Sequence, residues 1–191
     1  MGRTLRRWIT ITAVLLAVLT TEGCHVTKDS SGHQEACTAQ TLDLRHPPTR
    51  EQLGFAAGAN TATSACDAGF ALHVDLPHGT AFDLDVTQMV ADSLRSEQPT
   101  SGQPTTVAIT STSDGVATTA GRAVELARTL QMDPTEISAW RRTATATPDS
   151  TDDTTTPFIR STLGYVLAEL QVVRLSGSDN CYVSLILSWG H

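Results

Sequence analysis

The chain has 191 residues, a length that fits one domain of ordinary size, and 40% of them are hydrophobic, enough for one core. It carries 13 basic and 20 acidic residues, a formal net charge of -7, and Lys28 is its only lysine. The acidic balance argues against nucleic acid as a partner and against polybasic docking on anionic lipid. Chemistry that needs a lysine, such as a Schiff base or a phosphate-loop lysine, is nearly excluded as well.

The N-terminus has the order of a signal peptide. Arg3, Arg6 and Arg7 precede the apolar run Trp8–Leu19, and a cleavage site follows at Gly23. The run is too short to cross a bilayer comfortably, which takes about 20 residues. A retained anchor is the alternative. Removal of the first 23 residues leaves 10 basic and 19 acidic residues, a net charge of -9.

Cys24 lies where bacterial lipoproteins carry their lipidated cysteine. Gly23 fits the lipobox of that family, whereas Thr21 and Glu22 depart from it. We therefore expect a lipid anchor on Cys24, which would hold the protein at the outer face of the cell membrane, followed by a polar tether over residues 24–36. The alternative is a secreted chain in which Cys24 forms a disulfide.

The remaining cysteines are disulfide candidates. If Cys24 is lipidated, Cys37, Cys66 and Cys181 form one pair and leave one thiol over, whereas four unlipidated cysteines allow two disulfides. An exported compartment is oxidising in either case. No C-x-x-C spacing occurs, so zinc and thioredoxin-like chemistry have no support.

The first half of the exported chain predicts an irregular segment, a strand and a helix. Residues 37–67 show little periodicity, and a disulfide could hold them together. Phe70–Leu76 alternates apolar and polar residues, which predicts a half-buried strand. Asp85 followed by Gln88 resembles a capping box, and we expect a helix that begins there and ends before Pro99.

A strand, a helix and a loop are expected next. Thr105–Ile109 predicts the strand, and the apolar spacing over Ala120–Leu130 predicts the helix. Asp133–Glu136 has the cap, proline and glutamate that start a short helical turn. Residues 143–157 are polar and have no hydrophobic period, so we expect a mobile loop.

Two alternating segments close the chain. They are Val166–Leu175 and Cys181–Trp189, which flank a turn and predict a β-hairpin. The segment before them, Phe158–Leu167, is compatible with helix or strand. The resulting order is β-α-β-α-β-β. It predicts an α+β fold over residues 68–191, a two-layer sandwich with helices packed on one sheet.

No metal, cofactor or catalytic motif stands out. Five possible metal ligands lie close together in the sequence: His73, Asp75, His78, Asp83 and Asp85. Their spacing matches no established metal site, so we expect polar side chains on an outer strand face. There is no G-x-S-x-G, H-E-x-x-H or phosphate loop. We therefore expect a non-enzymatic protein without cofactor, and an exported hydrolase is the alternative.

Four short segments resemble motifs of the OmpA-like domain family, in the family's order. Phe82–Asp85 is similar to the F-D-F-D that closes its first strand, and Ile109–Asp114 keeps the isoleucine, a hydroxyl residue and the aspartate of I-x-G-H-T-D. Thr119–Ala123 is similar to the S-x-x-R-A motif, and Asp133–Ser138 resembles D-P-x-R-I with Glu136 in place of the arginine. The likeness covers roughly residues 68–173 and implies an OmpA-like arrangement.

The resemblance also implies a ligand. In the family, the aspartate of the first motif and the arginine of the R-A pair hold the diaminopimelate end of a peptidoglycan stem peptide, and these positions fall on Asp114 and Arg122. A carboxylate suits an ammonium group and a guanidinium suits a carboxylate. The loop between them is shorter than the family's and lacks its asparagine. The structural alternative is a turn or cap residue at Asp114 and a solvated Arg122 that pairs with Glu125.

The expected function is therefore that of a lipid-anchored cell-envelope protein that binds peptidoglycan or an envelope protein. A solute- or protein-binding lipoprotein on a diverged scaffold is the alternative.

Overall fold

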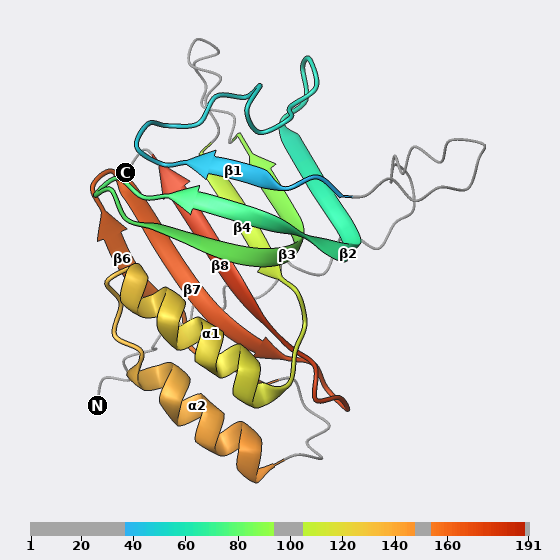
Figure 1. Cartoon of the computed structure of the whole chain (residues 1–191), viewed down its shortest axis with the longest axis vertical. Helices are drawn as coiled ribbons and strands as arrows, with labels where there is room; N and C mark the ends of the chain where they lie inside the picture. Colours follow the sequence, from blue (N-terminus) through green and yellow to red (C-terminus); the bar gives the residue numbers. More distant parts are fainter. Residues whose placement is uncertain (1–36, 94–104, 148–153, 190–191) are drawn as a thin grey trace, which may run out of the picture. The chain divides into compact units, whose positions relative to one another are not determined.

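An eight-stranded sheet and two helices make up the part of the chain described in the computed structural model, residues 37–93, 105–147 and 154–189 (Figure 1). The signal peptide, the lipid anchor on Cys24 and the tether lie outside the described residues and stay predictions. None of the described helices has the length and apolar content needed to cross a membrane.

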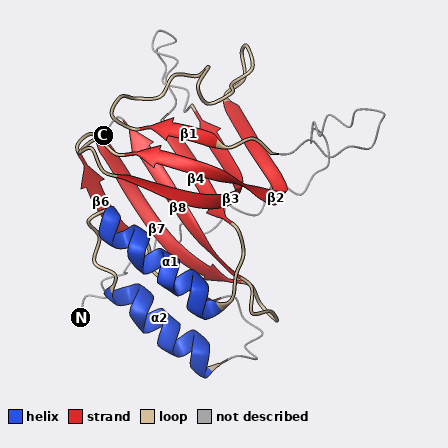
Figure 2. Cartoon of the chain, in the orientation of Figure 1, coloured by secondary structure: helices blue, strands red, loops and turns tan. Residues whose placement is uncertain are grey.

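The sheet is antiparallel apart from one pair of strands, and the helices follow its fourth strand (Figure 2). Its order is β1-β2-β3-β4-β8-β7-β5, with β6 also paired to β7, and β1 runs parallel to β2. The elements are β1 (Gln40–Asp43), β2 (Thr61–Asp75), β3 (Ala81–Asp92), β4 (Thr106–Ser111), α1 (Val116–Thr129), α2 (Thr135–Ala146), β5 (Thr154–Thr155), β6 (Ile159–Leu163), β7 (Val166–Arg174) and β8 (Cys181–Trp189).

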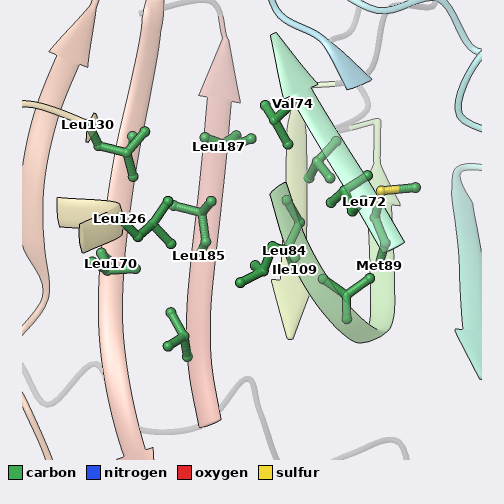
Figure 3. Close-up of a cluster of buried hydrophobic side chains, with 14 of the residues drawn as sticks. Leu72, Val74, Leu84, Met89, Ile109, Leu126, Leu130, Leu170, Leu185 and Leu187 are labelled. Carbon is green, nitrogen blue, oxygen red and sulfur yellow. The ribbon is translucent and has the colours of Figure 1, made fainter. Parts of the chain in front are cut away.

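Strict alternation in the last two strands builds the centre of the core. Every second residue of β7 and β8 is buried, because successive side chains of a strand point to opposite faces. Figure 3 shows Leu170 of β7 and Leu185 of β8 near Leu126 of α1, with Ile109 and Leu84 of the first strands across from them. Each fully buried leucine contributes roughly 1.5–3 kcal/mol to the hydrophobic stabilisation.

A tyrosine joins the two ends of the strand order. The hydroxyl of Tyr165, in the turn between β6 and β7, donates a hydrogen bond to the carbonyl of Leu44, just after β1. Leu44 itself is fully buried. Because β1 is one edge of the sheet and β6 lies at the other, the sheet curls strongly and encloses its apolar side chains.

The two helices form a pair of which α1 contacts the sheet. α1 packs against β7, β8 and β3, and α2 lies along α1 (Figure 1). Ala120, Ala123 and Ala127 are buried on α1, and such small side chains let the helix approach its neighbours closely. Ile137 and Trp140 of α2 complete the packing. The α+β class expected from the sequence is confirmed.

The helix predicted from Asp85 is wrong, and so is the element order β-α-β-α-β-β, because this segment is strand β3. The buried residues of β3 are Leu84 and Val86, then Met89 and Ala91. The buried positions are therefore even-numbered up to Val86 and odd-numbered from Met89 onward. This change coincides with a register shift between Val86 and Gln88 in the pairing with β4, which indicates a β-bulge. A bulge places two buried residues three apart, the same spacing as one helical turn.

Several other segments differ in extent from the expectations. The stretch 37–67 is not irregular throughout, because it holds β1 and the start of β2. Among the three disulfide candidates, Cys37 and Cys66 form the bridge and Cys181 is free. Within 143–157, α2 continues to Ala146 and β5 occupies Thr154–Thr155, while residues 148–153 lie outside the described part. The segment Phe158–Leu167, whose sequence is compatible with helix or strand, contains strand β6.

The remaining predicted elements are confirmed. The strand over Thr105–Ile109 is β4, the helix over Ala120–Leu130 is α1, and the terminal hairpin is β7–β8. A helix starts here as expected, but at Thr135 with Pro134 as its N-cap, one residue later than predicted. The carboxylate of Asp133 accepts hydrogen bonds from the backbone and hydroxyl of Thr135, 3.0 and 2.6 Å long. These bonds lower the pKa of Asp133. The helix is twelve residues long, not the single turn expected.

Candidate functional site

The structure brings Asp114 and Arg122, the predicted ligand-binding residues, into contact with each other. Nη2 of Arg122 lies 3.1 Å from Oδ2 of Asp114, and Nη1 donates to the carbonyl of Thr112 over 3.4 Å. The side chains of Arg122 and Asp114 are 25% and 44% exposed. An ion pair this open contributes about 0–1 kcal/mol, so a ligand could separate the two groups at little cost.

The backbone of Asp114 also connects the segment before α1 to the first residue of β8. Its backbone forms two hydrogen bonds of 2.8 Å with Cys181, one in each direction, and the hydroxyl of Thr119 donates to the carbonyls of both residues. Cys181 is a free and fully buried cysteine, and burial raises the pKa of its thiol. Its contacts join the start of α1 to the start of the last strand.

The candidate metal ligands form ion pairs instead of a metal site. Nδ1 of His73 lies 2.7 Å from Oδ1 of Asp83, and its Nε2 lies 3.6 Å from Oδ1 of Asp75. His78 and Asp85 are exposed. Within residues 37–93, 105–147 and 154–189, no group of three or more histidine, cysteine, aspartate or glutamate side chains could hold a metal ion.

These pairs continue into a charged network over β1–β3. Arg45 contacts Asp43 at 2.8 Å and Asp75 at 3.6 Å, so that carboxylates and cations alternate across the strands. The hydrogen bonds from Arg45 lower the pKa of Asp43 to about 2, and the hydrogen bond that His73 donates to Asp83 raises the pKa of His73. Each charged side chain of this network therefore has a partner within the network.

A groove between α1 and α2 has the strongest features of a binding site. Its volume is about 750 Å³, within the range of small-ligand sites. The apolar part of its floor is the partly exposed Val124 of α1, which lies over the buried Ala120 and Ile137, and Ser138 and Thr145 supply hydroxyl groups.

Three exposed arginines line this groove: Arg128 from α1, and Arg141 and Arg142 from α2. Glu125 is the one acidic residue in the lining. No ion pair in the described part of the chain involves any of the three arginines.

Other arginines of the described residues have carboxylate partners. Arg45, Arg122, Arg160 and Arg174 each pair with an aspartate or glutamate. In a chain with an excess of acidic residues, three neighbouring guanidinium groups left for solvent form a local positive field.

Both ends of α2 are anchored, which preforms the groove. Asp133 accepts hydrogen bonds from Thr135 at the start of the helix, and the buried Arg174 of β7 holds its end. Nη1 of Arg174 donates to the carbonyls of Ala144 and Thr147, over 3.2 and 2.8 Å. A cation at the C-terminus of a helix also interacts favourably with the helix dipole. Anchored walls reduce the ordering that a ligand has to impose.

A second, smaller cavity of about 260 Å³ lies beside β1. Leu42, Leu53, Leu72 and Met89 form its apolar part, with Glu51 among the polar residues at its rim. No cation lines it, and its size and charge make it a weaker candidate than the groove between the helices.

Sequence analysis missed the arginine-lined groove. The available signal was the pair Arg141–Arg142 in a helix, where neither residue has an acidic side chain three or four positions away to pair with. Arg128 lies on another helix, and its approach to this pair depends on how the two helices pack.

Comparison of the chain with protein-family models, with curated proteins and with solved structures gave no match. The OmpA-like resemblance therefore stays a prediction. The resemblance implied the order strand–helix–strand for the first elements of the domain. The structure has three successive strands there, β2, β3 and β4.

Proposed function

We propose that the protein is an exported, non-enzymatic binding protein of the cell envelope that holds an anionic ligand in the groove between α1 and α2. The observation that carries the proposal is a set of three arginines, Arg128, Arg141 and Arg142, around an apolar floor, none of which forms an ion pair with another described residue. The signal-like N-terminus and the position of Cys24 support export and a lipid anchor.

The chemistry of the lining supports binding over catalysis. A guanidinium group binds carboxylates and phosphates through two parallel hydrogen bonds and keeps its charge at every physiological pH. The lining contains no histidine or cysteine, and Glu125 is its one carboxylate, so these residues offer donors for an anion and no acid–base pair.

Two ligand classes fit an envelope location. Cell-wall peptidoglycan carries carboxylates on its stem peptides, and acidic segments of envelope proteins carry them on side chains. The pair Asp114 and Arg122 is a second candidate site for the wall ligand, implied by the OmpA-like resemblance, and lies outside the groove lining.

The test measures binding of the purified protein to purified peptidoglycan by sedimentation and to poly-L-glutamate by fluorescence anisotropy. We expect the combined variant Arg128→Gln, Arg141→Gln and Arg142→Gln to bind about tenfold more weakly than the unaltered protein. Arg160→Gln is the matched control, because it removes one exposed arginine that pairs with Glu169, away from the groove.

The outcomes separate the two candidate sites. Loss of peptidoglycan binding in the double variant Asp114→Ala and Arg122→Ala, with the groove variant unaffected, would assign the wall ligand to that pair. If neither probe binds in a way that depends on the three groove arginines, the proposed function is wrong.

A further inference from the structure

We infer that the occupant of the groove is an acidic, amphipathic helix of a protein partner. This inference rests on the proposed function and specifies which anionic ligand the groove takes. It is carried by three features together: the groove lies between two helices, its floor is apolar, and its cations come from both walls.

The shape of the groove fits a third helix. α1 and α2 lie side by side and are joined by a short connection, so they run antiparallel (Figure 1). The lining of α1 extends from Ala120 to Arg128, which is about 12 Å of helix at 1.5 Å per residue. Helices pack by laying the side chains of one into the groove formed by others, at axial distances of about 8–10 Å.

Small residues leave room for close approach. Gly121 is exposed in the groove lining, and a Cβ atom placed there would meet nothing within 4 Å. Ala120 lies beside it on α1. A glycine inside a helix costs stability by about 0.5–1 kcal/mol relative to alanine, so its use at an open position is accounted for if a partner packs over it.

The charges specify the partner's polar face. Arg128 extends from the last turn of α1, and Arg141 and Arg142 from α2, so cations flank the apolar floor. Acidic residues spaced three or four apart on a helix lie about 5–6 Å from one another and can reach both walls. A stripe of apolar residues between them would cover Val124, the partly exposed apolar side chain of the floor.

Other ligands fit these features less well. An anionic bilayer would face the net charge of -9 that the chain carries after removal of the first 23 residues, and this charge repels it, whereas a single helix contacts the local positive field alone. A polar glycan or a small anion would satisfy the arginines without covering the apolar floor. The combination of floor and cations therefore favours an amphipathic acidic helix.

The experiment titrates the purified protein with a synthetic peptide of about 18 residues that has a leucine stripe flanked by glutamates. We expect micromolar binding that weakens as the ionic strength rises from about 0.05 to about 0.5 M, since salt screens exposed charges. The triple arginine-to-glutamine variant should bind about tenfold more weakly. A peptide with lysines in place of the glutamates should not bind, and Arg160→Gln should change nothing.

Gly121→Leu tests the shape independently of charge. The leucine would fill the groove, and it has a higher helix propensity than glycine, so the variant should fold and lose peptide binding with all three arginines intact. Circular dichroism and thermal unfolding check the fold.

The failure of this inference is distinguishable from that of the proposed function. If peptidoglycan, or vesicles of phosphatidylglycerol and phosphatidylcholine, bind through the three arginines while the glutamate peptide does not, the helix is the wrong ligand and the groove remains an anion site. A dimer that Gly121→Leu dissociates would assign the groove to a second copy of the chain. If no probe depends on the arginines, both proposals fall.

Discussion

Gly69 allows β2 to approach Thr112, the residue after β4, at the point where β2 changes register. Its φ angle is +79°, a region that residues with a side chain rarely adopt, and a Cβ atom there would lie 2.9 Å from Cγ2 of Thr112. The position falls between Ala65 and Phe70, where the pairing of β2 with β3 shifts. Here one residue type determines how a long strand bends over the core.

We predict that Gly69→Ala destabilises the protein by about 1–3 kcal/mol, measured by urea unfolding. Part of this cost is the positive φ angle and part is the contact with Thr112. Thr112→Ser removes Cγ2, so the double variant should recover the steric part only. Equal stability of Gly69→Ala and the unaltered protein would contradict the strained geometry.

The pH dependence of His73 is a second prediction for a single residue. The hydrogen bond with Asp83 raises the pKa of His73 above its ordinary value of 6.5. The pair therefore stabilises the fold fully below about pH 6.5 and loses its effect as the pH rises through the folded-state pKa. An NMR titration of the imidazole should show this raised pKa, and Asp83→Asn should lower it. A pKa that Asp83→Asn leaves unchanged would refute the cause assigned here.

At the scale of elements, the bulge in β3 explains the largest difference between prediction and structure. An ideal strand buries every second residue, and an ideal helix buries residues three and four apart. Val86 and Met89 satisfy the helical spacing because the bulge between them adds one residue. The capping pattern of Asp85 and Gln88 strengthened the wrong interpretation, since nothing local tells a cap from two exposed strand residues.

The disulfide secures the element at the sheet edge. Cys37 and Cys66 are 29 residues apart, and the bridge joins the segment before β1 to β2. In the chain-entropy description, closing a loop of this length stabilises a fold by roughly 2–4 kcal/mol. We predict a loss of this size in the double variant Cys37→Ser and Cys66→Ser, measured by urea unfolding. Adding a reductant should destabilise the unaltered protein and leave the double variant unchanged.

At the scale of the whole molecule, closure of the curled sheet depends on Tyr165. Its hydroxyl reaches the carbonyl of Leu44 across the two ends of the strand order. We predict that Tyr165→Phe costs about 1 kcal/mol, the usual net value of a hydrogen bond. Amide hydrogen exchange should become faster in β1, with little change in the central strands β7 and β8. Faster exchange spread evenly over the sheet would contradict a local closure.

The distribution of charge also belongs to this scale. The chain is acidic, yet three arginines that form no ion pair with other described residues line the groove between α1 and α2, while the charges over β1–β3 pair among themselves. Net charge alone therefore describes the protein's average field and not the field that a ligand in the groove would meet.

What the sequence by itself determined is local. The period of the apolar residues predicts β4, α1 and the β7–β8 hairpin, and the start signal Asp133–Glu136 predicts the beginning of α2. Together they indicate the α+β class, because each of these patterns lies within one continuous segment. The tertiary structure alone decided the identity of β3, the contact of Asp114 with Arg122, and the meeting of Arg128 with Arg141 and Arg142. These features depend on a register shift or on the packing of separate elements, and such long-range geometry leaves no regular period in the sequence.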